Sequence, residues 1–326
     1  MRVGIGTFNL NNLFSRFNFQ AEVDPDSGPD IEVRTTFTFT DPTKYRLRTS
    51  FTGGLVDEKP PEEQRVIASR LNFINAQVPS VIAVQEVENV EALREFSSKY
   101  LDGSHHLTLV EGNDPRLIDV GIISKWPIGA VTSWQHAVHP DLQGRRIFSR
   151  DLLEVQVLNE SRTRRLFTVF NTHLKSHFVP FNAPDTEAAH REANLLRKRQ
   201  AETMRDIISA RTRPDSPFVI AGDMNDPPDS EWLAPLVASD DLPVTNALHG
   251  ARETRPPRPD TPPPPGDGLW THRFKAAGAP ARYELFDHIW LSDALVDNKV
   301  EAWIDRRTTL TGDGSDHDPA WVVMDV

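Results

Sequence analysis

The chain has 326 residues, of which 38% are hydrophobic and 25% charged, and its formal net charge at pH 7 is −11. This composition is that of a folded globular protein, and the acidic balance argues against a broad surface of clustered Lys and Arg. The absence of cysteine excludes disulfides, zinc thiolate sites and cysteine nucleophiles. Chemistry on phosphates is not excluded, because a bound metal ion turns a ring of carboxylates into a phosphate site.

The N-terminal segment Met1–Asn9 runs directly into a strand-like pattern, so the sequence indicates no signal peptide. No apolar run reaches the roughly 18 residues that a membrane span requires. We therefore expect a cytoplasmic protein without membrane insertion, or a secreted one if a leader has been removed. The sequence gives no indication of protein partners or oligomeric state.

Short apolar runs rich in β-branched residues alternate with amphipathic patterns along the chain. The apolar runs predict strands at Val3–Leu10, Val81–Gln85, Val120–Ser124, Leu152–Leu158, Leu166–Phe170, Phe218–Ala221, Phe286–Leu291 and Trp321–Val326. The amphipathic patterns predict helices at Glu62–Gln77, Asn89–Tyr100 and Thr186–Ala210. The last of these carries basic residues that predict either a solvated face or a face that follows phosphates: Arg191, Arg197, Lys198, Arg199 and Arg205.

Two irregular stretches interrupt this alternation. Residues 18–61 are polar and rich in turn formers, and residues 255–268 contain four consecutive prolines, which cannot join a sheet. We interpret both as long loops of a single α/β domain spanning 1–326, with helices on both sides of the sheets, because motifs required by one site lie on either side of them.

Carboxylate, amide and imidazole side chains gather where six strand-like segments end; Asp287, for example, follows Tyr283–Phe286. The six segments contribute Asn9 and Asn11, Glu86, Asn171 and His173, Asp223 and Asn225, Asp287, and Asp316 and His317. Each segment alone is typical of a turn, a helix terminus or an exposed loop. Because strand ends of layered α/β folds meet at one edge, the six together predict a shared cleft.

The motifs in these segments are Phe8-Asn9, Gln85-Glu86, Asn171-Thr172-His173, Gly222-Asp223-Met224-Asn225, Asp287-His288 and Ser315-Asp316-His317. In kind and order the chain resembles the endonuclease/exonuclease/phosphatase superfamily, which includes deoxyribonuclease I, exonuclease III, apurinic endonucleases, neutral sphingomyelinases and inositol polyphosphate 5-phosphatases. The resemblance implies a four-layer α/β/β/α sandwich with two central mixed sheets. It also implies metal-dependent hydrolysis of phosphoesters.

The same resemblance implies a metal site and a catalytic group. Glu86, with Asn11 and Asp316, is expected to bind Mg²⁺, for which Mn²⁺ or Ca²⁺ can substitute, since hard cations prefer oxygen ligands. Several nucleases carry Asp where this chain has Asn11. A neutral amide lowers the negative charge of the ligand set, so the resemblance does not decide whether one metal ion binds or two.

The expected catalytic residues surround the phosphate. His317, oriented by Asp287, is expected to act as general base or to contact the phosphate. Asp223 is expected to orient or activate the attacking water. The resemblance assigns the stabilisation of charge on the phosphate oxygens to Asn9, Asn225 and His173.

The predicted substrate contacts are Asn171, Lys175, Arg145 and Arg146. Lys175 with the neighbouring His177, and the basic island formed by Arg145, Arg146 and Arg150, are equally consistent with solvated surface charges.

Three functions are consistent with these residues. A nuclease acting on DNA or RNA, most simply an endonuclease, is favoured over a small-molecule or lipid phosphodiesterase or phosphatase. The sequence has no long apolar loop for a lipid surface, and Asp226-Pro227-Pro228-Asp229-Ser230 replaces the basic signature of the inositol phosphatases. A non-catalytic binding module is disfavoured, because every core position keeps a residue able to fill its role.

Overall fold

The computed structural model describes residues 1–17, 55–179, 184–255, 268–274, 278, 280–306 and 314–326. The chain divides into two compact units, one comprising Met1–Leu13 and Lys59–Val326, the other Phe14–Glu58. In the smaller unit, β2 (Ser15–Phe17) pairs antiparallel with β3 (Leu55–Glu58). The predicted loop at 18–61 is therefore wrong at its end, where a strand precedes the first helix. The remainder of that loop, and nearly all of 255–268, lie outside the described residues.

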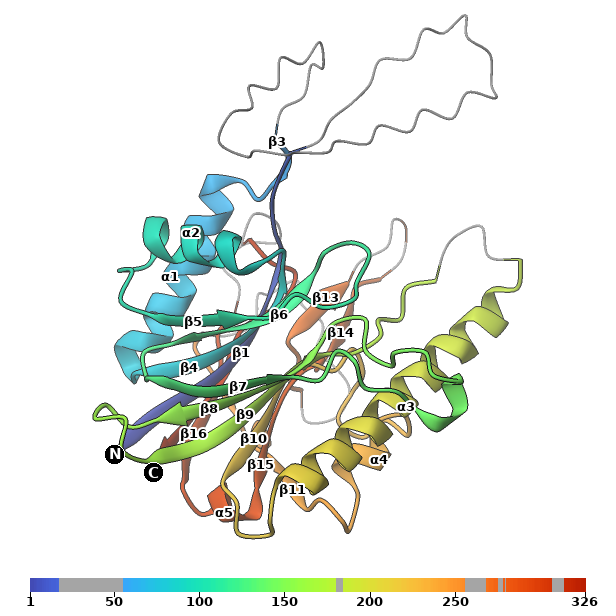
Figure 1. Ribbon diagram of the computed structural model, residues 1–326. Coiled ribbons are helices and arrows are strands. Elements are labelled where there is room, and N and C mark those ends of the chain that lie inside the picture. Colours follow the sequence, from blue (N-terminus) through green and yellow to red (C-terminus); the bar gives the residue numbers. More distant parts are fainter. Residues whose placement is uncertain (18–54, 180–183, 256–267, 275–277, 279, 307–313) are drawn as a thin grey trace, which may run out of the picture. The chain divides into compact units, whose positions relative to one another are not determined.

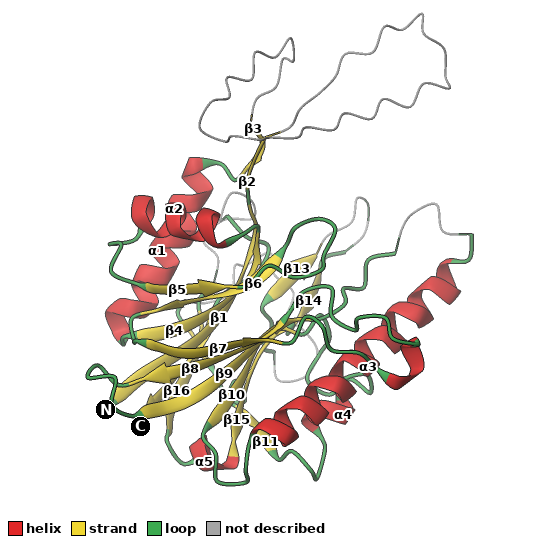
Figure 2. Ribbon diagram, in the orientation of Figure 1, coloured by secondary structure: helices red, strands yellow, loops and turns green. Residues whose placement is uncertain are grey.

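The larger unit is built on two mixed sheets (Figures 1 and 2). The first has the order β12 (Arg252–Glu253), β16 (Lys299–Ile304), β17 (Ala320–Asp325), β1 (Arg2–Leu13), β4 (Ser80–Val87), β6 (Asp119–Ser124), β5 (His106–Leu109). In this sheet β1 is parallel to β4 and β12 to β16, and the other neighbours are antiparallel.

The second sheet has the order β11 (Val244–Asn246), β15 (Asp287–Ser292), β10 (Phe218–Asp223), β9 (Arg165–His173), β8 (Leu152–Leu158), β7 (Ile128–Ser133). Only β9 and β10 run parallel in it. A separate hairpin is formed by β13 (His272–Phe274) and β14 (Arg282–Glu284).

Helices cover the outer face of each sheet. On one side lie α1 (Pro61–Gln77) and α2 (Val90–Tyr100), and on the other α3 (Thr186–Arg211) and the short α4 (Ala234–Val237), as Figure 1 shows. A single turn, α5 (Asp293–Val296), follows β15. Asn89 and Asp185 cap α2 and α3 by accepting hydrogen bonds of 2.9 Å from backbone N–H groups in the first turn. The predicted four-layer α/β/β/α sandwich is confirmed.

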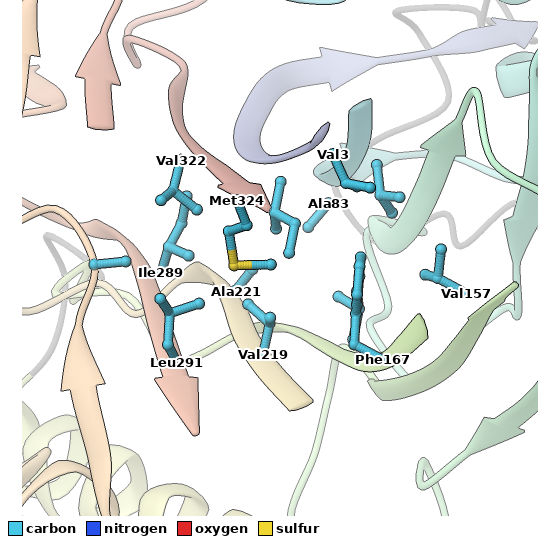
Figure 3. Packing of buried hydrophobic residues seen from close by; sticks show 14 of the residues in the cluster. Val3, Ala83, Val157, Phe167, Val219, Ala221, Ile289, Leu291, Val322 and Met324 are labelled. Carbon is cyan, nitrogen blue, oxygen red and sulfur yellow. The ribbon is translucent and has the colours of Figure 1, made fainter. Parts of the chain in front are cut away.

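Alternation along the central strands divides the core into three layers. In β1, Val3 and Ile5 point into the layer between the sheets, whereas Phe8 and Leu10 pack under α1 and α2. A third cluster lies beneath α3 and α4. Figure 3 shows the layer between the sheets, where Val3, Ala83, Val322 and Met324 of the first sheet face Val157, Phe167, Val219, Ala221, Ile289 and Leu291 of the second.

The predicted helices and central strands are present, with ends shifted by one or two residues in most cases. The strands that the sequence did not predict fall into two groups. Some lie at or next to a sheet edge, namely β5, β7, β11, β12 and β16, and the others form the small β2–β3 and β13–β14 pairs. Edge strands are short and half-exposed, so their apolar pattern is weak. No helix in the described part of the chain is long and apolar enough to cross a membrane.

Strand direction brings the predicted site residues to one edge. In the second sheet, the register places Asp223 opposite His173 on one side and opposite Asp287 on the other. Asp287 is thus the first residue of β15 rather than a residue after a strand, and it reaches the same edge because β15 runs antiparallel to β10. In the same way, Ser315–His317 precede β17, which runs antiparallel to β1.

Candidate active site

Asp223 is the centre of the candidate site and is 1% exposed. Its Oδ2 accepts a 2.9 Å hydrogen bond from Asn9 Nδ2 and lies 3.5 Å from His173 Nε2 and 3.7 Å from His317 Nε2. Its Oδ1 accepts a 2.9 Å hydrogen bond from the backbone N–H of Asn225. Four of the predicted residues thus surround one buried carboxylate.

The predicted hydrogen bond between Asp287 and His317 is present, with 2.6 Å between Asp287 Oδ2 and His317 Nδ1. The backbone N–H of Asp287 donates to the hydroxyl of Thr271 over 3.0 Å. The hydroxyl of Ser315 donates to the Asn9 carbonyl over 2.6 Å and accepts the backbone N–H of His317 over 3.0 Å. Both members of the Asp287–His317 pair are therefore held through their backbones.

Electrostatics place the two imidazoles of the site in opposite charge states at neutral pH. Burial alone lowers the pKa of His317, but the charges of Asp287 and Asp223 outweigh it and raise that pKa to about 10. Burial lowers the pKa of His173 well below its usual value, and the positive charges of Arg150 and His317 lower it further. Burial also raises the pKa of Asp223 to about 6, although the charge of His317 opposes this.

Two of the three predicted metal ligands, Asn11 and Glu86, lie on bulged backbone. The pairing of β1 with β4 is interrupted after Asn9, and φ is +49° at Asn11 and +60° at Glu86, in the left-handed region. Residues other than glycine are uncommon there, and such bulges re-aim side chains at strand ends. At Asn11 the bulge interrupts the alternation of side chains between the two faces of the strand. Glu86 is half-buried, and its Oε2 accepts a 3.1 Å hydrogen bond from the backbone N–H of Asn12.

The donor set suits a hard divalent cation. Glu86, Asn11 and Asp316 offer only carboxylate and amide oxygens, which Mg²⁺ and Mn²⁺ prefer. Burial lowers the pKa of the nearby Lys59 ammonium, while the charges of Glu63, Asp316 and Glu86 act to raise it. Glu86 and Asp316 therefore contribute to one region of negative potential, as a cation site requires.

Asn171 has a different environment from the one expected for a substrate contact. It is fully buried in β9, and its Nδ2 donates across the inter-sheet layer to the carbonyls of Val84 (3.1 Å) and Gly121 (2.7 Å). Its Oδ1 accepts a 2.9 Å hydrogen bond from Gln85 Nε2. Both amide hydrogens are already donated, so Asn171 joins the two sheets and has no N–H left for a phosphate.

The basic island before β8 separates into exposed and buried members. Arg145 and Arg146 are exposed, and Arg146 donates to the side-chain oxygen of Asn113. Arg150 is 3% exposed, and its Nε lies 3.1 Å from Asp114 Oδ2. Its charge acts to lower the pKa of His173, so Arg150 contributes to the electrostatics of the site.

The basic face predicted for the third helix is wrong at Arg197. This side chain is fully buried, donates to Asp226 Oδ2 over 3.0 Å and donates to the Lys175 carbonyl over 2.9 Å. Lys175 itself is half-buried, and its Nζ donates to the carbonyls of Ser176 and Phe178. Burial, followed by the charges of Arg150 and Arg197, lowers the pKa of Lys175 to about 8. Arg197 thus supports the segment after β9 and cannot follow a phosphate backbone.

A row of stacked rings leads away from His317. His272 packs against His317 with 4.7 Å between ring centroids, and Phe286 is stacked between His272 (5.1 Å) and His177 (5.6 Å). No sequence signal points to His272, which stands alone after Trp270-Thr271 and near the proline-rich stretch.

The comparisons with known proteins agree with this geometry. The sequence matches the Endonuclease/Exonuclease/phosphatase family over residues 6–317. The fold is similar to an AP endonuclease from Archaeoglobus fulgidus, with a TM-score of 0.60 and 15% identity over 99% of this chain and 100% of that chain. It is also similar to an endonuclease/exonuclease/phosphatase from Bacteroides vulgatus, with a TM-score of 0.59 and 15% identity over 100% of this chain and 99% of that chain.

A third similar structure is D. rerio TDP2 in complex with a single-stranded DNA product, with a TM-score of 0.56 and 14% identity over 100% of this chain and 99% of that chain. At these identities the likeness concerns the fold alone. The comparison with curated proteins gave no match. Because the family match extends over nearly the whole chain and includes all six motifs, the chain belongs to the Endonuclease/Exonuclease/phosphatase family, whose members hydrolyse phosphoesters.

Proposed function

We propose that the chain is a divalent-metal-dependent nuclease that cleaves phosphodiester bonds of DNA, most simply as an endonuclease. The observation that carries the proposal is the buried Asp223 carboxylate, within 4 Å of both His173 and His317. A site that pushes the pKa values of neighbouring groups apart separates proton acceptor from proton donor, as hydrolysis of a phosphodiester requires.

The side chains divide the work as follows. Asp223, with its pKa raised to about 6 by burial, is largely ionised at neutral pH and accepts a proton from the attacking water. His317 carries its proton at neutral pH and donates a hydrogen bond to a phosphate oxygen, with Asp287 fixing the orientation of the ring. His173, kept neutral by burial, and Asn9 contact the remaining oxygens.

Asn225 has two roles in this arrangement, to orient Asp223 and to contact the phosphate. Its backbone N–H orients Asp223, and one hydrogen of its side-chain amide is donated to the Leu174 carbonyl over 3.1 Å. The second hydrogen of that amide is assigned to the phosphate.

Glu86, Asn11 and Asp316 would hold the metal ion. When bound, Mg²⁺ neutralises phosphate charge and lowers the pKa of water at the site; Mn²⁺ or Ca²⁺ can replace it. We expect Glu86→Ala to reduce Mg²⁺-dependent activity more than tenfold while the far-UV circular dichroism stays that of the wild type.

Two observations support DNA as the substrate. Structures of similar fold include an AP endonuclease and TDP2 with bound single-stranded DNA product. Arg145 and Arg146 are exposed on the same loop as the buried Arg150, where they are available to contact backbone phosphates.

The test compares substrates and arginine pairs. Supercoiled plasmid, single-stranded DNA, RNA and bis-p-nitrophenyl phosphate are incubated with Mg²⁺, Mn²⁺ or EDTA. Arg145→Ala/Arg146→Ala should raise KM for DNA and reduce its salt dependence, because fewer counterions are released. Hydrolysis of bis-p-nitrophenyl phosphate should not change.

The matched control is Arg162→Ala/Arg164→Ala, which removes two exposed arginines from the turn before β9, at the end of that strand opposite His173. Equal effects of the two pairs, or cleavage of bis-p-nitrophenyl phosphate without any cleavage of nucleic acid, would reject the nuclease in favour of a small-molecule phosphodiesterase.

A further inference from the structure

A second group of metal-ligating side chains lies next to the proposed catalytic residues. His272, Asp316 and His317 each offer a ligand atom, and these atoms lie within 4.8 Å of one another. His272 Nε2 is 3.6 Å from Asp316 Oδ2. The residues come from the start of β13 and from the segment before β17, so the group forms only in the folded chain.

Backbone contacts hold the three residues in place. His272 and His317 form an isolated antiparallel bridge, and the backbone N–H of Arg273 donates to the Asp316 carbonyl over 3.3 Å. The ring of His272 is also fixed by its stack on Phe286, with 5.1 Å between centroids and 13° between planes. The backbone segments that carry the two imidazoles and the carboxylate are therefore bound to each other, and the His272 ring is packed in place.

We propose that His272, Asp316 and His317 form a site for a borderline-soft divalent ion such as Zn²⁺, and that this ion inhibits the enzyme. Two imidazoles and one carboxylate are the ligands that Zn²⁺ accepts, whereas Mg²⁺ prefers oxygens alone. The inhibition rests on the proposed function; the binding of the metal does not.

The three ligand atoms lie within 4.8 Å of one another, so small movements of the side chains would bring them around one shared ion. Bonds of about 2.0–2.1 Å in a tetrahedron place neighbouring ligand atoms about 3.3 Å apart. The 3.6 Å between His272 Nε2 and Asp316 Oδ2 exceeds this by a few tenths of an ångström, which side-chain rotation can close. Nδ1 of His317 is bound to Asp287, so Nε2 is the nitrogen left for the metal, and Zn²⁺ has to displace the proton that Nε2 carries at neutral pH. The result would be the carboxylate–histidine–metal arrangement common in zinc sites.

Inhibition follows from the ligands that the ion uses. A metal on His317 Nε2 removes the nitrogen that is proposed to contact the phosphate. Asp316 is shared with the proposed Mg²⁺ site, so Zn²⁺ also competes for that residue. We expect Zn²⁺ at a small fraction of the Mg²⁺ concentration to lower kcat.

The test measures binding before activity. After treatment with EDTA, the whole chain is titrated with Co²⁺, followed by its visible absorption, and Zn²⁺ is then used to displace it; isothermal titration with Zn²⁺ gives the affinity. His272→Phe keeps a ring against Phe286 but removes the ligand. Loss of a second-shell partner already costs about 10–100-fold in metal affinity, so loss of this ligand should cost at least that much.

The control is His177→Phe, which alters the opposite face of Phe286 and leaves the three ligands intact. It should bind Zn²⁺ like the wild type. His272→Phe should keep the Mg²⁺-dependent activity of the wild type and lose its inhibition by Zn²⁺. His272→Gln serves as a second variant if His272→Phe does not fold.

The outcomes separate the two proposals. Zn²⁺ binding that depends on His272, in a chain without phosphoesterase activity, would support the metal site and reject the proposed function. Mg²⁺-dependent hydrolysis together with unchanged Zn²⁺ affinity in the His272 variants would overturn the metal site alone. Absence of a Co²⁺ spectrum in the wild type would likewise overturn it.

Discussion

Replacing Asp287 by Asn tests whether the charge of His317 matters for catalysis. The side chains are nearly equal in volume, so the substitution changes the charge and the hydrogen-bonding pattern while preserving the packing. In the protein, Asp287 Oδ2 lies 2.6 Å from His317 Nδ1, and Asp287 is fully buried. An Asn amide at this position has no negative charge to hold the His317 imidazolium, so the ring loses the positive charge that it is proposed to present to the phosphate.

The expected losses differ for catalysis and for stability. Loss of one donor that stabilises transition-state charge costs about 10²–10³ in kcat, so we expect kcat to fall by a factor of that order with little change in KM. Removing one partner of a buried ion pair costs about 3–5 kcal/mol when the other charge remains. His317 can release its proton once Asp287 is gone, so the unfolding free energy should fall by less, about 1–3 kcal/mol.

The assay is hydrolysis of bis-p-nitrophenyl phosphate in saturating Mg²⁺, with urea unfolding measured in parallel and the protonation state of His317 followed by ¹⁵N NMR. Asp305→Asn is the matched control, because Asp305 is also buried and bound to an arginine, with 2.9 Å between Arg70 Nε and Asp305 Oδ2. It should lose stability without losing kcat. A fall in kcat of less than tenfold in Asp287→Asn, or an equal fall in Asp305→Asn, would refute the reasoning.

The remaining predictions concern Asp223 and two structural positions. The pKa of Asp223 is raised to about 6 and its carboxylate is the active form, so kcat should reach its maximum above that pH and fall as the pH decreases through about 6. A loss of kcat only near pH 4 would contradict the role of Asp223 as proton acceptor. Asn171→Leu removes three buried hydrogen bonds, two to carbonyls and one from Gln85 Nε2, and at about 0.5–1.5 kcal/mol each urea unfolding should show a loss of about 1.5–4.5 kcal/mol. Gly222→Ala places a Cβ 2.0 Å from the Thr172 carbonyl at a φ of +144°, and a loss of at least about 2 kcal/mol is expected in the same assay.

Local patterns in the sequence were sufficient to predict the main helices and central strands, whereas the four-layer arrangement was implied by the family resemblance. In β1 the alternation of Val3 and Ile5 with glycines, followed by Phe8 and Leu10, matches the observed change of core layer along the strand. The amphipathic repeat of α1 and the capping residue Asn89 of α2 correctly located both helices. These features depend on residues near one another in the chain, because the periods of strands and helices are local properties.

Buried charge was decided by the tertiary structure. Arg197 lies on an amphipathic helix among other arginines and lysines, and nothing in that pattern distinguishes it from its solvated neighbours. It is buried because Asp226, on a turn after β10, reaches the same point and supplies the partner that a buried guanidinium requires. Arg150 is buried beside Asp114 for the same reason.

The motifs nominated the candidate site residues, but they did not predict their contacts. Asn9 and Asp223 are separated by 214 positions and meet over 2.9 Å, and His272 meets His317 although no motif includes it. Asn171 belongs to a motif, yet its amide joins the two sheets. Residues far apart in sequence come together only through strand order, register and the packing of one sheet on the other. These depend on the whole chain, because each is fixed by burying all the apolar faces at once.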